Sequence, residues 1–297
     1  MIIFLRRILI IIGIIISVFF LYIYGGSEYE LRKASAVEIG LLIETDSASI
    51  AKGEHIARTR GCFGCHGQRL EGLVFTDQWD WVKRAVAPNL AAYAKTHTPA
   101  TIEAAVRQGI GQDGKALYSM PSYNWAHLSD SDVASLIAFL RSAEVVPNEL
   151  PKPSLGLSAR WAIANGKEST MPELVAIVPP LLADAQADSL LSAGQYLAMT
   201  ACNECHGLDL RGQFRGGRST PDLAIVSSYS VDEFEHLMKE GKGKGDREIR
   251  LMSMVARDRF AHFTEKELND LRRFLLTLPN RPVPTPVEWR ETPLIGQ

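Results

Sequence analysis

The fold is decided by two short stretches, Cys62-Phe63-Gly64-Cys65-His66 and Cys202-Asn203-Glu204-Cys205-His206. Together they use all four cysteines of the 297-residue chain, so no cysteine is left over. In each stretch two cysteines stand three positions apart and a histidine follows directly, a spacing typical of haem c attachment.

The spacing has a chemical reason. Two thiols on one helical turn can each add to a vinyl group on the same porphyrin edge, and the next residue can then bring its imidazole to the iron. A single copy would also suit a redox dithiol or half of a zinc site. Two copies with no other cysteine favour two haem c groups. The first would be held by Cys62, Cys65 and His66, and the second by Cys202, Cys205 and His206.

The two motifs lie in two copies of one helical unit. Each copy has a helix before the motif, a short turn after it, a middle helix and a last helix with a capping residue. The middle helices begin at Thr98 and Ser230 and end eleven residues later, near Gly109 and Gly241. The other matching segments are 53–58 with 194–199, 87–90 with 220–223, and the caps Ser129 and Thr264. Apolar residues recur at helical spacing and no strand pattern competes, so we expect an all-α protein.

Each unit resembles a class I (mitochondrial-type) cytochrome c domain, and the pair is similar to the membrane-anchored di-haem cytochromes c of bacteria. The resemblance covers about 49–143 and 188–279. It implies two tandem helical haem domains, at 48–143 and 188–280. It also implies that the carbonyls of Pro88 and Pro221 accept a hydrogen bond from the free ring nitrogen of each haem histidine, which orients the iron ligand. The alternative is that each proline only shapes a turn.

The resemblance further implies a methionine as the second axial ligand of each iron, a pair that leaves no open coordination position. Met120 lies eleven residues after Gly109 and is the candidate in the first unit. In the second unit the same count from Gly241 gives Met252, with Met254 as the alternative. His127 and His262 occupy matching places ahead of the last helices and are the alternative ligands.

An apolar segment at the amino terminus predicts a membrane anchor. The run from Ile2 to Tyr24 is interrupted by Arg6 and Arg7, and as one helix it would match the thickness of a bilayer core. We therefore assign 1–26 to a transmembrane helix. The two arginines place its start in the cytoplasm and the haem domains in the periplasm or extracytoplasmic space. A cleaved signal peptide is the alternative, although the run is long for one and no Ala-x-Ala-like site follows.

Proline-rich composition predicts two extended segments, a semi-rigid linker over 144–187 and a strap over 281–297. The segment ahead of the last helix of the second unit is basic. One interpretation is a docking patch for an acidic redox partner, and the other is a solvated loop of mixed charge. Its basic residues are Lys239, Lys242, Lys244, Arg247, Arg250, Arg257 and Arg259.

A net charge of −2 and a pI near 6.4 argue against a nucleic-acid partner. The sequence contains no constellation typical of catalysis, so we expect an electron carrier rather than an enzyme. Its expected partners are redox proteins and the membrane. It could serve as part of a larger oxidoreductase or oxidase complex, for instance docked to a respiratory or dehydrogenase complex. The alternative is a di-haem peroxidase-like enzyme with one open iron site.

Overall fold

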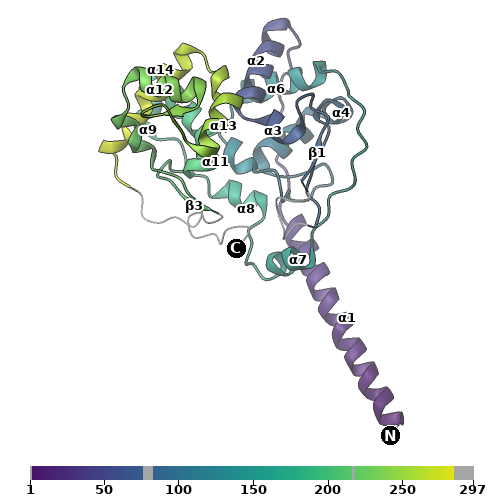
Figure 1. The fold of residues 1–297 in the computed structure, drawn as a ribbon. Helices are drawn as coiled ribbons and strands as arrows, with labels where there is room; N and C mark the ends of the chain where they lie inside the picture. Colours follow the sequence, from purple (N-terminus) through teal and green to yellow (C-terminus); the bar gives the residue numbers. More distant parts are fainter. Residues whose placement is uncertain (1, 76–82, 216–217, 284–297) are drawn as a thin grey trace.

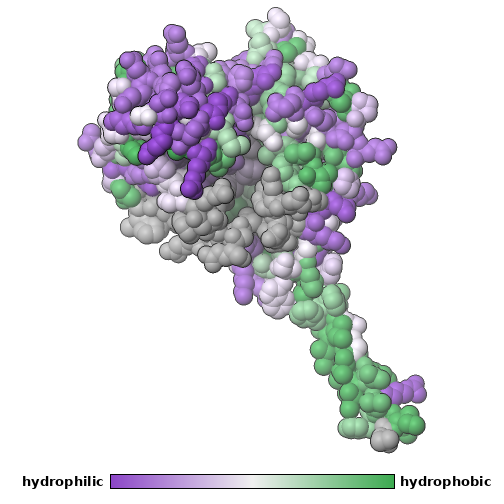
Figure 2. All heavy atoms as spheres, viewed as in Figure 1, coloured by the Kyte–Doolittle hydropathy of each residue, from purple (hydrophilic) through white to green (hydrophobic). Residues whose placement is uncertain are grey.

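A computed structural model describes residues 2–75, 83–215 and 218–283. A single long helix, α1 (Ile2–Arg32), projects from a helical head with two lobes, which are formed by successive parts of the chain (Figure 1). Figure 2 shows α1 as an apolar rod, whereas hydrophilic side chains gather over the second lobe.

The first lobe is built around helices α2 and α6, which pack against each other. Its helices are α2 (Ser47–Thr59), α3 (Cys62–His66), α4 (Leu90–Thr96), α5 (Pro99–Glu103), the π-turn η1 (Ala104–Gln108), the 3-10 turn η2 (Ser122–Trp125) and α6 (Asp130–Ser142). A two-residue ladder pairs β1 (Leu73–Val74) with β2 (Val86–Ala87).

The second lobe repeats this plan around α10 and α14. Its helices are α9 (Ala183–Ala187), α10 (Ser189–Leu197), the π-turn η3 (Ala198–Cys202), α11 (Asn203–His206), η4 (Leu223–Ser228), α12 (Val231–Glu240), α13 (Arg250–Asp258), η5 (Phe260–His262), α14 (Glu265–Leu275) and η6 (Leu278–Asn280). Two short ladders pair β3 (Phe214–Arg215) with β4 (Arg218–Ser219) and β5 (Lys242–Gly243) with β6 (Arg247–Glu248).

In each lobe the first and last helices cross at a glycine. A Cβ added to Gly53 would stand 2.0 Å from the carbonyl oxygen of Ser135, and one added to Gly194 would stand 2.0 Å from that of Asp270. No side chain fits in such a space, so the two helix backbones can approach this closely only because each first helix carries glycine there.

The predicted helix limits are largely confirmed. Capping boxes begin α12 at Ser230 and α14 at Thr264, and Thr98 caps α5 with a proline following. Gly109 and Gly241 end the middle helices with φ of 72° and 73°, a left-handed conformation that favours glycine. Within residues 2–75, 83–215 and 218–283 the structure is mostly helical, as predicted, with three two-residue ladders that the sequence analysis did not foresee.

The amino-terminal helix is longer than the predicted membrane segment over 1–26. Helix α1 continues past Tyr24 to Arg32, because residues 25–32 contain no proline and the face of Ile23, Ser27 and Leu31 is buried against the head. By length and composition, α1 is able to cross a membrane, a test that a signal sequence at the same place would also pass.

The linker is more ordered than its proline content suggests. It carries α7 (Leu157–Ala164) and α8 (Met171–Ala176), and α9 lies in its last part. Helix α7 lies against α1 (Figure 1): the rings of Trp161 and Phe19 are 5.7 Å apart, and Arg160 Nη1 donates to Ser27 Oγ at 2.8 Å. The linker therefore supports the amino-terminal helix instead of only spacing the lobes. The predicted strap over 281–297 lies outside the described residues from 284 onward.

Polar and aromatic contacts join the two lobes. His55 Nε2 lies 2.8 Å from Glu267 Oε1, and Asn203 Nδ2 donates to the carbonyl of Asn124 at 3.1 Å. Tyr196 of the second lobe donates a short hydrogen bond to the Asp132 carboxylate of the first. The motif-bearing ends of the lobes are thus held together by specific hydrogen bonds.

We predict that Gly53→Ala and Gly194→Ala each destabilise the protein, by about 1–3 kcal/mol from overpacking. Helix propensity alone would give the opposite sign, because alanine is favoured over glycine by about 1 kcal/mol inside a helix. Urea unfolding followed by circular dichroism measures the change. Gly40→Ala is the control, since a Cβ there meets nothing within 4 Å. Unchanged or raised stability in both crossing variants would contradict the close approach.

A second prediction concerns acid. Burial alone would raise the pKa of Glu267, but hydrogen bonds with His55 and from the Thr264 N–H outweigh it and lower the pKa to about 2. The carboxylate therefore stabilises the fold fully above its unfolded pKa of about 4.3, and this contribution is lost as the pH falls toward 2. We expect Glu267→Gln to cost about 1–2 kcal/mol at pH 6, after allowing for solvent screening, and almost nothing near pH 2.

Denaturant unfolding at several pH values checks this difference. Glu265→Gln is the matched control, because Glu265 lies in the first turn of the same helix and is exposed. An equal effect of the two substitutions at pH 6 would show that the contact with His55 contributes nothing.

Candidate functional site

The two Cys-x-x-Cys-His motifs end in the same turn. Helix α3 contains the whole first motif, whereas Cys202 ends the π-turn η3 and α11 carries the rest of the second, and each histidine is followed by a glycine with φ of 83°. Farther on, Leu70 and Leu210 are buried with φ of 61° and 63°, an unusual conformation for leucine that occurs at the same place in both lobes. The sequence repeat is therefore a structural repeat down to single residues.

This turn brings each motif histidine to a proline carbonyl. His66 Nδ1 lies 2.8 Å from the oxygen of Pro88, and His206 Nδ1 lies 2.8 Å from that of Pro221. A carbonyl can only accept, so Nδ1 carries the proton in both rings and Nε2 is the nitrogen left for a metal. Burial lowers the pKa of both histidines, which keeps the imidazoles neutral as metal ligands must be.

The cysteines do not resemble a redox dithiol. No disulfide joins any two of the four. Burial raises the pKa of Cys62 to about 11 and that of Cys202 to about 12, whereas redox Cys-x-x-Cys motifs lower the pKa of their reactive thiol. A zinc site lacks ligands as well, because no three His, Cys, Asp or Glu side chains within 2–75, 83–215 and 218–283 are grouped to hold a metal ion. Paired thiols with a neutral imidazole beside them fit haem c, which would be attached through the two thiols and bound at its iron by the imidazole.

The methionines lie in different local structures in the two lobes. Met120 lies in a loop just before η2 and packs against the first core, where the buried Ser122 hydroxyl donates to the carbonyl of Ala105 at 2.7 Å. Met252 and Met254 lie on helix α13, which the sequence analysis did not predict. Met252 packs against the second core, whereas Met254 is 56% exposed.

The alternative histidine ligands have other contacts. His127 Nε2 lies 2.8 Å from the carbonyl of Pro179 in the linker. His262 is exposed, and its pKa is lowered by partial burial and by the neighbouring Arg58 and His55. His127 thus contacts the linker, and His262 lies near Arg58 and His55 of the first lobe.

The basic segment of the second lobe is largely neutralised by its own carboxylates. Glu248 lies 3.1 Å from Lys242 and 3.2 Å from Arg257, and Lys239 donates to backbone carbonyls near η5. This pattern agrees with a solvated loop of mixed charge better than with a docking patch. Arg259 differs from the rest, because its partner is Glu204 inside the second motif, at 2.8 Å.

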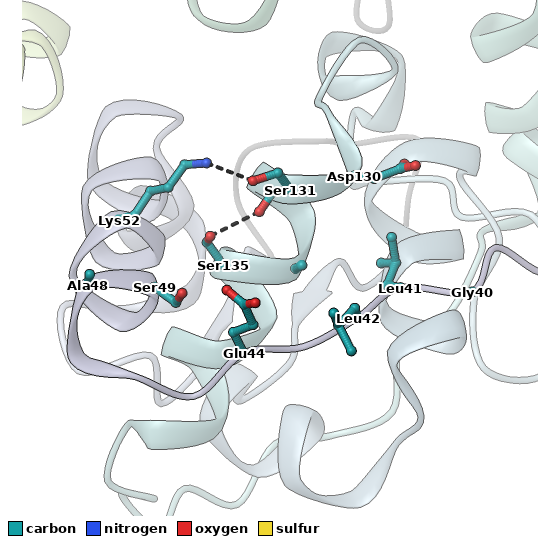
Figure 3. A pocket seen from close by; sticks show the side chains of 11 residues that line it. Gly40, Leu41, Leu42, Glu44, Ala48, Ser49, Lys52, Asp130, Ser131 and Ser135 are labelled. Atoms are coloured by element: carbon teal, nitrogen blue, oxygen red, sulfur yellow. Dashed lines mark hydrogen bonds between the residues drawn. The ribbon is translucent and has the colours of Figure 1, made fainter.

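A pocket elsewhere in the first lobe is lined by none of the motif residues. It lies between the segment around Leu41 and helices α2 and α6, where Lys52 Nζ donates to Ser131 Oγ at 3.0 Å (Figure 3). Its lining residues are Gly40, Leu41, Leu42, Glu44, Ala48, Ser49, Lys52, Asp130, Ser131, Ala134 and Ser135. Without cysteine, histidine or methionine, this pocket is separate from the motif chemistry.

Sequence reasoning missed the residues that lie between the two motifs. Arg60 is only 4% exposed, and its guanidinium lies 5.9 Å from the ring centroids of both Tyr196 and Phe263. Such a buried cation is costly unless it is compensated, and the aromatic faces supply part of that compensation. The position of Arg60 just before Gly61 and Cys62 was the one sign in the sequence that it lies near a motif. Its contacts with Tyr196 and Phe263 could not be predicted, because these residues are far away in the sequence.

Comparison with known proteins agrees with the geometry. Residues 50–144 match the cytochrome c family. The chain is 23% identical over 275 residues to the cytochrome c subunit of alcohol dehydrogenase (quinone) from Gluconobacter oxydans, covering 80% of this chain and 56% of that protein. The corresponding subunit from Komagataeibacter europaeus is 25% identical, covering 81% and 58%.

A cytochrome subunit of fructose dehydrogenase from Gluconobacter japonicus is 26% identical, covering 78% of this chain and 53% of that subunit. The chain thus spans little more than half the length of these relatives. The first lobe, with its motif helix, its His66–Pro88 contact and its family match, is a cytochrome c domain, which implies covalently bound haem c, and the chain is homologous to cytochrome c subunits of dehydrogenases.

Proposed function

We propose that this chain is a membrane-anchored di-haem cytochrome c that passes single electrons through two haem c groups and has no substrate chemistry of its own. One observation carries the proposal. The contact between a motif histidine and a proline carbonyl has the same 2.8 Å length in both lobes and follows the same turn. A second lobe built in this way supports a second haem domain, although the family match covers only the first.

The proposed roles follow from the chemistry of the side chains. Cys62 with Cys65, and Cys202 with Cys205, would hold the two haems by thioether bonds. His66 and His206 would bind the irons through Nε2, with Pro88 and Pro221 fixing their orientation. Met120 and Met252 would be the second axial ligands. Haem c would supply a one-electron couple. A methionine–histidine ligand pair gives the iron a higher reduction potential than more strongly donating ligand pairs do.

The membrane location and the redox partner are proposed on less specific observations. Helix α1 has the length and composition of a membrane span, and the two arginines near its start favour a cytoplasmic amino terminus with both lobes outside. The relatives are cytochrome subunits of alcohol and fructose dehydrogenases. We propose accordingly that this chain takes electrons from a dehydrogenase complex at the extracytoplasmic face of the inner membrane.

The count of haems tests the function. We expect two haems per chain by pyridine haemochrome assay, both resistant to acid–acetone extraction because they are covalently attached. The double substitutions Cys62→Ser/Cys65→Ser and Cys202→Ser/Cys205→Ser should each leave one haem. The proposal fails if the wild-type pigment is extracted, if only one haem is present, or if metal analysis finds zinc in place of iron.

The choice between the two methionines of α13 gives a further prediction. Met252→Leu should abolish the thioether–iron charge-transfer band of one haem, lower its potential and let it bind carbon monoxide, since the methionine ligand raises the potential and closes the iron. Met254→Leu is the matched control on the same helix, and its exposed side chain predicts no change. The reverse result would assign Met254 as the ligand.

A further inference from the structure

Arg259 lies between the two haem-attachment motifs and contacts both. It follows α13 directly, and its Nη1 lies 2.8 Å from Glu204 Oε2, within the second motif. On its other side it meets the first motif: a Cβ added to Gly61, the residue before Cys62, would stand 2.2 Å from the Arg259 Cζ atom. A Cβ at Gly64, between the two cysteines of that motif, would lie 3.9 Å from Nη2.

The absence of a side chain at position 61 makes this contact possible. Gly61 is buried with φ of 81°, so the guanidinium packs directly against the backbone that leads into α3. The equivalent position of the second lobe is Ala201, which lies inside the π-turn η3. The first lobe therefore has glycine where the second has alanine, and the glycine leaves room for the guanidinium of Arg259.

Electrostatics supports the same placement. Burial lowers the pKa of Arg259, whereas the Glu204 carboxylate raises it. The guanidinium therefore keeps its positive charge beside the second motif. The Asn203–Asn124 hydrogen bond and the contacts of the buried Arg60 with Tyr196 and Phe263 also join the two lobes.

We infer that Arg259 is a positioning residue for electron transfer between the two haems, holding the two attachment motifs next to each other. The inference rests on the proposed function, because it requires both haems. One electron would leave a ferrous iron on one side and reduce a ferric iron on the other, without a proton or any further reactant. The positive charge of Arg259 favours the ferrous form of both irons, because that form is less positive, and so raises both reduction potentials.

Redox titration of each haem tests the inference. We expect Arg259→Gln to lower the midpoint potentials of both haems, with a three- to tenfold change in the ferrous-to-ferric ratio at fixed potential, where tenfold corresponds to about 59 mV for one electron. It should also slow electron equilibration between the haems after rapid partial reduction. Arg257→Gln is the matched control: Arg257 lies two residues away, but it pairs with Glu248 in the basic segment. It should change neither quantity.

Two further variants keep the inference testable if Arg259→Gln does not fold. Glu204→Gln removes the counter-charge and should raise both potentials. Arg259→Lys keeps the charge but loses the planar fork, and should retain the potentials while slowing equilibration. The inference is overturned if Arg259→Gln, or Glu204→Gln where Arg259→Gln does not fold, carries two haems and leaves both potentials unchanged or shifts only one. A wild-type protein with fewer than two haems would instead refute the proposed function, so the two failures are distinguishable.

Discussion

The close crossing of two helix backbones in each lobe is the constraint on which the rest of the structure depends. At Gly53 and Gly194 the first helix contacts the carbonyl of the last helix without any side chain between them. That contact fixes the angle at which each first helix delivers its motif, and the left-handed turn that follows then brings the motif histidine to a proline carbonyl. One added methyl group between the two helices would displace the motif and, with it, the contact between the motif histidine and the proline carbonyl.

The two lobes share one arrangement of helices but differ at the start of the motif and in the methionine segment. In the first lobe α3 starts after a left-handed glycine, whereas in the second the helix runs on through a π-turn into the motif. The methionine segment is a loop in one lobe and a helix in the other. These differences lie at the interface between the lobes or near it. The two lobes thus have the same geometry at the motif histidine but different structures at the start of the motif and around the methionines.

Much of the fold and of the candidate site was predictable from the sequence because it depends on local signals. The capping residues Ser230 and Thr264 and the terminal glycines act within one helical turn, and the spacing of the cysteines acts within the motif itself. Other features depend on contacts between distant residues. Helix α1 extends beyond its apolar run because the head covers one of its faces, and Arg259 could be recognised only as one basic residue among several.

The support that α7 gives to α1 affects how the head can meet other proteins. Trp161 contacts α1 at Phe19 and Arg160 contacts it at Ser27, and the carbonyl of Leu31 accepts a hydrogen bond from the Ala116 N–H in the first lobe at 2.7 Å. These contacts restrict rotation of the two lobes about α1. If α1 stands in a bilayer, both lobes keep one orientation relative to it, which limits the faces they can present to a partner anchored in the same membrane.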